Sequence, residues 1–125
     1  MILRALNRDW EPRGSSPVAL DDVAKAIAML DGVSRTLVTL EVDDDHHMGI
    51  GGGHEQYVVY MTVDNLSFKN LVRADAEGPL VTLMCGGQEG EYPARQCVDQ
   101  ATATRAAQTF AETGQPDVAL KWDEA

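Results

Sequence analysis

The chain has 125 residues, of which 44% are apolar, 24% charged and 6% aromatic. That length is typical of one domain, and apolar residues recur along all of it, which excludes a wholly disordered chain. Ten Lys and Arg against 20 Asp and Glu give a net charge of −10, so we expect binding to neither nucleic acid nor an anionic membrane. No apolar run approaches the roughly 20 residues of a membrane span, and the N-terminal residues lack a signal-peptide pattern. We therefore expect one cytoplasmic domain over residues 1–125.

The first third of the chain predicts a strand, a loop, a helix and a second strand. Residues 2–6 are expected to form a short strand, and residues 11–17, with two prolines, a glycine and two serines, a loop. A helix is expected from Asp21 or Asp22 to about residue 31, because Val23, Ile27 and Leu30 recur at helical spacing. The alternation in residues 38–42 then predicts a half-buried strand.

Residues 43–55, DDDHHMGIGGGHE, are polar at first and then rich in glycine, and they predict one long loop. The next segment, QYVVYMTV, is apolar on both faces and predicts a central strand. The glycines lack the Lys-Ser/Thr of a phosphate loop and do not complete a GxGxxG pattern. We interpret them as backbone that turns tightly before the central strand.

The second half of the chain predicts hairpins followed by a helix. Turns are expected at Asp64-Asn65 and at residues 86–90, with an edge strand at EYPARQ. A last helix is expected to begin at the cap residue Asp99 and to end at Gly114, before a short terminal strand. Its buried face is expected to hold Ala103, Ala106, Ala107 and Phe110, and Phe110 and Trp122 are both expected in the core.

Strands that are joined by tight turns pair in antiparallel fashion, and each helix has one apolar face to bury. The predicted fold class is therefore α+β, an antiparallel sheet of about five strands with two helices packed on one face.

The chain lacks the usual motifs of a metal site or an enzyme. Its histidines do not have HExxH spacing, and two adjacent histidines in an extended chain point to opposite sides. Cys85 and Cys97 have neither CxxC spacing nor a base nearby in sequence, so we expect two free thiols. We expect no enzyme activity, no metal and no cofactor. A small ligand- or metal-binding domain that uses the His- and Gly-rich loop stays open as the alternative.

Three stretches of the chain follow one another in an order that is typical of a known family. They are MGIGGGHEQYVVYMTVDN (48–65), LVTLMCGGQEGEYPARQCV (80–98) and ATRAAQTFAETGQPDVALKW (103–122). Their marker residues are Glu91, Tyr92, Pro93, Phe110, Thr113, Gly114, Pro116 and Trp122. With these motifs the chain resembles the polymorphic-toxin immunity protein family that is usually paired with nucleic-acid deaminase toxins.

The resemblance implies a single immunity-protein-like domain that binds a cognate bacterial toxin and neutralises it by covering its active site. It implies that the toxin is basic and acts on nucleic acid, as a DNA cytosine deaminase. An acidic inhibitor suits such a toxin, because carboxylates mimic phosphate groups and speed association with a basic surface.

We expect the toxin to contact the loop over residues 43–55, because long polar loops often carry recognition and this one has the densest run of acids. The candidate binding residues are Asp43, Asp44, Asp45, His46, His47, His54, Glu55 and, as a secondary candidate on the later hairpin, Glu89.

Overall fold

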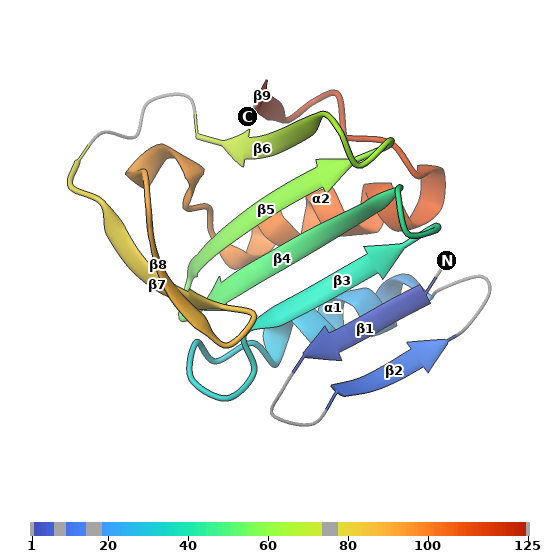
Figure 1. Cartoon of the computed structure of the whole chain (residues 1–125), viewed down its shortest axis with the longest axis horizontal. Helices are drawn as coiled ribbons and strands as arrows, with labels where there is room; N and C mark the ends of the chain where they lie inside the picture. The colour runs from blue at the N-terminus through green and yellow to red at the C-terminus, as the bar shows by residue number, and fades with distance from the viewer. Residues whose placement is uncertain (1, 7–9, 15–18, 74–77, 125) are drawn as a thin grey trace.

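The computed structural model describes residues 2–6, 10–14, 19–73 and 78–124, with side chains from residue 19 onward. A large antiparallel sheet forms one layer, and two helices lie side by side on one of its faces (Figure 1). These helices are α1 (Leu20–Ala28) and α2 (Gln100–Thr113). The predicted α+β fold, with both helices on one face of an antiparallel sheet, is confirmed.

The large sheet has seven strands in the order β2-β1-β3-β4-β5-β6-β9, rather than about five. The strands are β1 (Ile2–Leu6), β2 (Trp10–Gly14), β3 (Leu37–Glu41), β4 (His47–Gly53), β5 (Gln56–Thr62), β6 (Phe68–Val72) and β9 (Lys121–Glu124). The predicted loop over residues 11–17 is wrong at residues 11–14, which belong to β2, while residues 15–17 lie outside the described residues. Pro12 is compatible with β2 because an edge strand has one row of backbone groups without sheet partners.

The prediction of one long loop over residues 43–55 is also wrong. Residues 47–53 form β4, which pairs with β3 on one side and β5 on the other. Glycine has a low intrinsic preference for strands, so its abundance here indicated a loop. In the fold, β4 is held between two strands and its glycines are covered by neighbouring groups, so tertiary packing outweighs the local preference.

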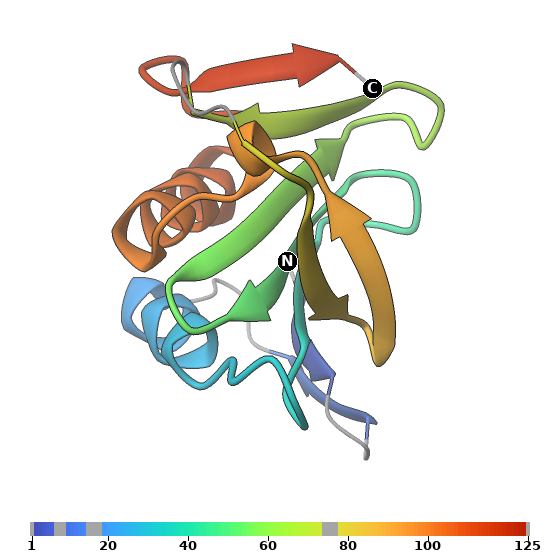
Figure 2. The same cartoon turned by 90° about the vertical axis from the view of Figure 1, so that its left-hand side faces the viewer.

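The remaining strands form a separate hairpin, β7 (Val81–Cys85) with β8 (Gln88–Tyr92), instead of extending the large sheet. The hairpin lies on the side of the sheet away from the helices (Figure 2). A 3₁₀ turn, η1 (Ala94–Gln96), follows β8 where the sequence predicted that EYPARQ would continue as an edge strand. We call the sheet surface on the hairpin side the front face.

The core lies between the sheet and the helices. The predicted stripes are confirmed: Val23, Ile27, Leu30, Ala103, Ala106, Ala107 and Phe110 are all buried. Helix α2 begins as predicted, with the Asp99 carboxylate accepting the backbone N–H of Thr102 at 2.8 Å. It ends at Gly114, whose φ of 69° is a conformation that glycine adopts without strain. Small alanines on α2 let it approach the sheet closely.

The two aromatic residues that we predicted in the core differ in burial. Phe110 is fully buried, whereas Trp122 is half-buried and packs against the core from β9. The Trp122 indole N–H donates to the carbonyl of Asp117 at 3.1 Å, which ties β9 to the loop before it.

We predict that Phe110→Ala lowers the free energy of unfolding by about 3–5 kcal/mol, because it leaves a cavity that α2 and the sheet cannot close. Trp122→Ala is expected to lower it by less, because water already reaches part of the indole. Urea denaturation of both variants checks this order. A Phe110→Ala loss below about 1 kcal/mol would contradict the core position.

Candidate functional site

Strand β4 separates the binding residues that the sequence placed in one loop. Asp43, Asp44 and Asp45 lie in the turn between β3 and β4, while His54 and Glu55 lie in the turn between β4 and β5. At about 3.3 Å per strand residue, the seven residues of β4 put these turns about 20 Å apart. The predicted residues therefore belong to opposite ends of the sheet.

The adjacent histidines point to opposite sides, as predicted. The His46 ring lies edge-on to Phe110, with centroids 5.5 Å apart, and its Nε2–H donates to the carbonyl of Gly114. The His47 ring lies edge-on to Tyr60 on the front face, with centroids 5.7 Å apart. His46 thus fastens the β3–β4 turn to the end of α2, and His47 belongs to a different surface.

The three aspartates of the β3–β4 turn have different roles. The Asp43 carboxylate accepts the backbone N–H groups of Asp45 and His46 at 2.8 and 2.9 Å, so it holds the turn in shape. The side chains of Asp44 and Asp45 are exposed and have no partner in the described part of the chain. Of these three aspartates, Asp44 and Asp45 are therefore the ones free to meet another molecule with both carboxylate oxygens.

The turn between β5 and β6 lies beside the β3–β4 turn, because His47 pairs with Thr62 at the ends of β4 and β5. It is built in the same way: Asp64 accepts the backbone N–H groups of Leu66 and Ser67 at 2.9 and 2.8 Å. These hydrogen bonds hold the pKa of the Asp64 carboxyl below its ordinary value. Residues 42–46 and 63–67, which we call the acidic end, include exposed apolar residues as well: Val42, Val63 and Leu66.

The opposite turn, at His54 and Glu55, supports the start of α2. Both residues have positive φ, 54° and 64°, which a tight turn between β4 and β5 requires. The Glu55 carboxylate accepts the backbone N–H of Gln100 at 3.4 Å, at the positive end of the helix dipole.

Among the described residues, no three His, Cys, Asp or Glu side chains come together as ligands for a metal ion.

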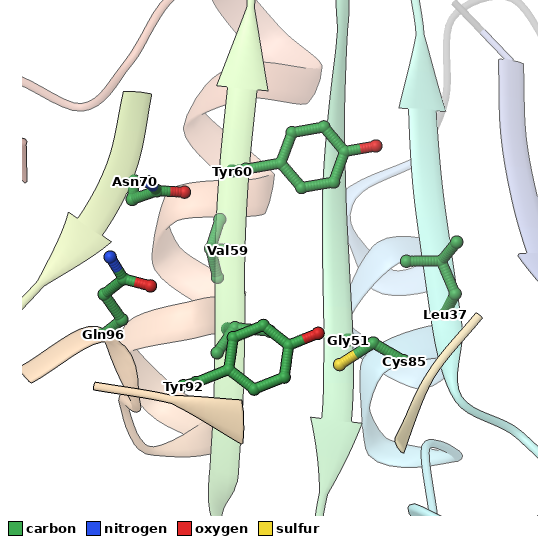
Figure 3. A pocket seen from close by; sticks show the side chains of 9 residues that line it. Leu37, Gly51, Val59, Tyr60, Asn70, Cys85, Tyr92 and Gln96 are labelled. Carbon is green, nitrogen blue, oxygen red and sulfur yellow. The ribbon is translucent and has the colours of Figure 1, made fainter. Parts of the chain in front are cut away.

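On the front face, two glycines of β4 make room for groups from other strands. A side chain at Gly49 would place its Cβ 2.2 Å from the Tyr60 ring, and one at Gly51 would lie 2.6 Å from the Cys85 sulfur. The Tyr60 ring therefore crosses β4 from β5, and hairpin β7–β8 docks directly on the β4 backbone (Figure 3). Beside Gly49 in register is Thr39, which is 8% exposed and whose Oγ1 has no hydrogen-bond partner among the described residues.

Between the hairpin and the sheet lies a pocket of about 120 Å³. Its lining residues come from both layers: Leu37, Gly51, Val58, Val59, Tyr60, Asn70, Cys85, Tyr92 and Gln96. Burial raises the pKa of Tyr92 to about 12, helped by a hydrogen bond with the Cys85 thiol, and burial likewise raises the pKa of that thiol. Tyr92 and Cys85 are thus neutral at physiological pH, and none of the described residues that line the pocket is charged.

None of these lining residues was among the candidates from the sequence. The signal that points to them is the spacing of Gly49, Gly51 and Gly53, which alternate along the chain with a period of two. In a strand, residues two apart share a face, so this spacing leaves that face of β4 without side chains from Gly49 to Gly53. That interpretation requires residues 47–53 to be recognised as a strand first, and their glycine content instead predicted a loop.

A family model described as immunity protein Imm1 matches residues 18–124 of the chain, which includes both helices and every strand from β3 to β9. The chain belongs to the Imm1 family. The resemblance drawn from the sequence motifs is thereby confirmed, and with it the role of an immunity protein, which neutralises a cognate toxin. No curated protein matches the chain.

Membership in the Imm1 family means that the functional site of this protein is a surface for a toxin. Two features of the described surface lie close to one another, the acidic end and the front face with its pocket. His47 and its contact Tyr60 lie between them.

In the described part of the chain, no helix has both the length and the apolar character needed to cross a bilayer.

We predict that Gly49→Ala lowers the free energy of unfolding by about 1–3 kcal/mol, because its Cβ displaces the Tyr60 ring. In a Tyr60→Ala background the same change is expected to lower it much less, since the obstructing ring is absent. A double-mutant cycle measured by urea denaturation gives this coupling. Equal losses in both backgrounds would show that another contact excludes the Cβ.

Proposed function

We propose that this immunity protein acts in the cytoplasm and neutralises a toxin domain that deaminates cytosine in DNA, by covering its active site. The observation that carries the proposal is membership in the Imm1 family, which implies a cognate toxin. The deaminase class of the toxin is supported by the resemblance of the sequence motifs. It is supported as well by the net charge of −10, because a toxin that acts on nucleic acid needs a basic surface.

The acidic end suits the first contact with such a toxin. Asp44 and Asp45 are exposed and have no partner among the described residues, so they can accept hydrogen bonds from Lys or Arg groups that otherwise hold a phosphate backbone. Asp43 and His46 contribute by holding the turn, through their bonds to the turn backbone and to Gly114. The acidic end contains four aspartates and no Lys or Arg.

The other predicted residues have different places in the proposed complex. His47 and Glu89 lie on the front face and on the exposed side of hairpin β7–β8, next to the same surface. His54 and Glu55 are about 20 Å away at the far turn, and Glu55 already bonds to α2. We therefore include His47 and Glu89 in the proposed contact and leave His54 and Glu55 at its margin or outside it.

The direct test is co-expression with the toxin that the adjacent reading frame encodes. The proposal expects the two proteins to co-purify, and the purified immunity protein to abolish cytosine deamination of a DNA substrate by that toxin. Failure of the pair to associate would overturn the proposal. Association with a toxin of another activity would keep the immunity role and remove the deaminase assignment.

We predict that Asp44→Asn with Asp45→Asn slows association with the toxin and weakens its dependence on salt, because charges at the rim of an interface act mainly on the association rate. Asp43 stays unchanged in this variant, since its carboxylate holds the turn. Binding kinetics at two salt concentrations provide the measurement.

The matched control is Asp21→Asn with Asp22→Asn, two exposed aspartates in the first turn of α1. It changes the net charge by the same amount as the turn variant but lies on the helix side of the sheet. Equal effects of the two double variants would show that only net charge matters and would remove the acidic end from the interface.

A further inference from the structure

The pocket between hairpin β7–β8 and the sheet combines apolar walls with free hydrogen-bonding groups. Leu37, Val58 and the two tyrosine rings provide the walls. The side-chain amides of Asn70, on β6, and Gln96, in η1, lie at the same pocket, and the Gln96 amide extends toward Asn70 (Figure 3). Neither amide has a hydrogen-bond partner in the described part of the chain. An apolar hollow with a few convergent polar groups is the usual composition of a binding site.

The size of the pocket restricts its occupant. Sites for small molecules and cofactors usually enclose about 300–1,000 Å³, whereas this pocket encloses about 120 Å³. That volume suits a single side chain of another protein. The absence of charge among the nine lining residues favours an apolar side chain over a Lys or Arg, because a buried charge would find no counter-charge there.

The surroundings of the pocket restrict the partner as well. Residues 78–93, which contain the hairpin, include Glu89 and Glu91, both exposed, and no Lys or Arg. In the other direction the front face continues through Tyr60 and His47 toward the acidic end. Arg95, which precedes the lining residue Gln96, is paired with Asp123 at 2.9 Å. A partner that fills the pocket therefore meets carboxylates of the hairpin on one side and of the acidic end on the other, which favours Lys or Arg around the inserted group.

We propose that the pocket is the anchor site for the toxin, and that it takes one apolar side chain from a toxin loop that carries Lys or Arg beside it. The amides of Asn70 and Gln96 hydrogen-bond to backbone N–H and C=O groups of that loop. Those backbone groups have no partner in regular secondary structure while the loop is inserted. The acidic end then acts at the rim of the same interface. Interfaces commonly have this form, with an anchor in a desolvated pocket and charged residues around it. This inference rests on the proposed toxin-binding function.

Two variants test the anchor, with the purified toxin of the adjacent reading frame, inactivated at its catalytic site, as the probe. Val58→Phe fills the pocket from the sheet side and is expected to raise Kd about 30-fold or more, as loss of a hot-spot contact does. Asn70→Ala with Gln96→Ala leaves the walls intact and is expected to raise Kd about tenfold, through two lost hydrogen bonds. The matched control is Thr104→Ala, which removes a polar group from α2 on the other side of the sheet and is expected to leave Kd unchanged.

The outcomes separate this inference from the proposed function. Thermal unfolding first establishes that each variant is folded. If Val58→Phe does not fold, the variant with Asn70→Ala and Gln96→Ala still tests the pocket, because it changes no apolar wall. Wild-type affinity in the folded variants would overturn the anchor and leave toxin binding standing, whereas a wild-type protein that does not bind the toxin would overturn both. Self-association of the wild type that Val58→Phe abolishes would assign the pocket to a second copy, and a small molecule retained in native mass spectrometry would assign it to a ligand. Either finding contradicts the proposal.

Discussion

The close contact between the front of β4 and the groups that cover it determines the rest of this structure. At Gly49 and Gly51 the strand has no side chain, so the Tyr60 ring and the Cys85 sulfur lie against its backbone. The opposite side of the same strand presents Met48 and Ile50 to the helices, and both are fully buried. One central strand therefore supports an ordinary hydrophobic core on one side and a close-fitting hairpin on the other. An added methyl group at Gly49 would displace the Tyr60 ring, and one at Gly51 would push the hairpin away from the sheet.

The binding surface follows from this contact. Because β7–β8 docks at the Gly51 end of β4, it covers only part of the front face and leaves a pocket beside Tyr60 and Asn70. The rest of the front face leads to the acidic end, where Asp43 and Asp64 each hold a tight turn through backbone N–H groups. These hydrogen bonds keep both turns in one conformation, so their exposed neighbours are presented without a large loss of chain entropy on binding.

The same arrangement relates the two kinds of contact that an immunity protein needs. Charges at the acidic end act over distance and speed the encounter with a basic partner. An apolar pocket acts only on contact and slows dissociation, because the inserted group must be rehydrated on leaving. Since the two regions share the side of the sheet opposite the helices, one partner can reach both of them. Helices α1 and α2 are then left to stabilise the sheet from behind.

The sequence by itself determined the elements whose signals are local. The apolar stripes on both helices, the cap at Asp99, the stop at Gly114 and the antiparallel order were all correctly predicted, because each depends on residues a few positions apart. Motif order was enough to identify the family. Strand β4 was mistaken for a loop, because a glycine-rich strand is stable only when other parts of the chain pack on it. For the same reason the acidic residues were assigned to one loop together with His54 and Glu55, and the pocket was missed. Only the tertiary structure could place Asn70, Cys85 and Gln96 together, because they come from three separate segments that meet when the hairpin docks on the glycines of β4.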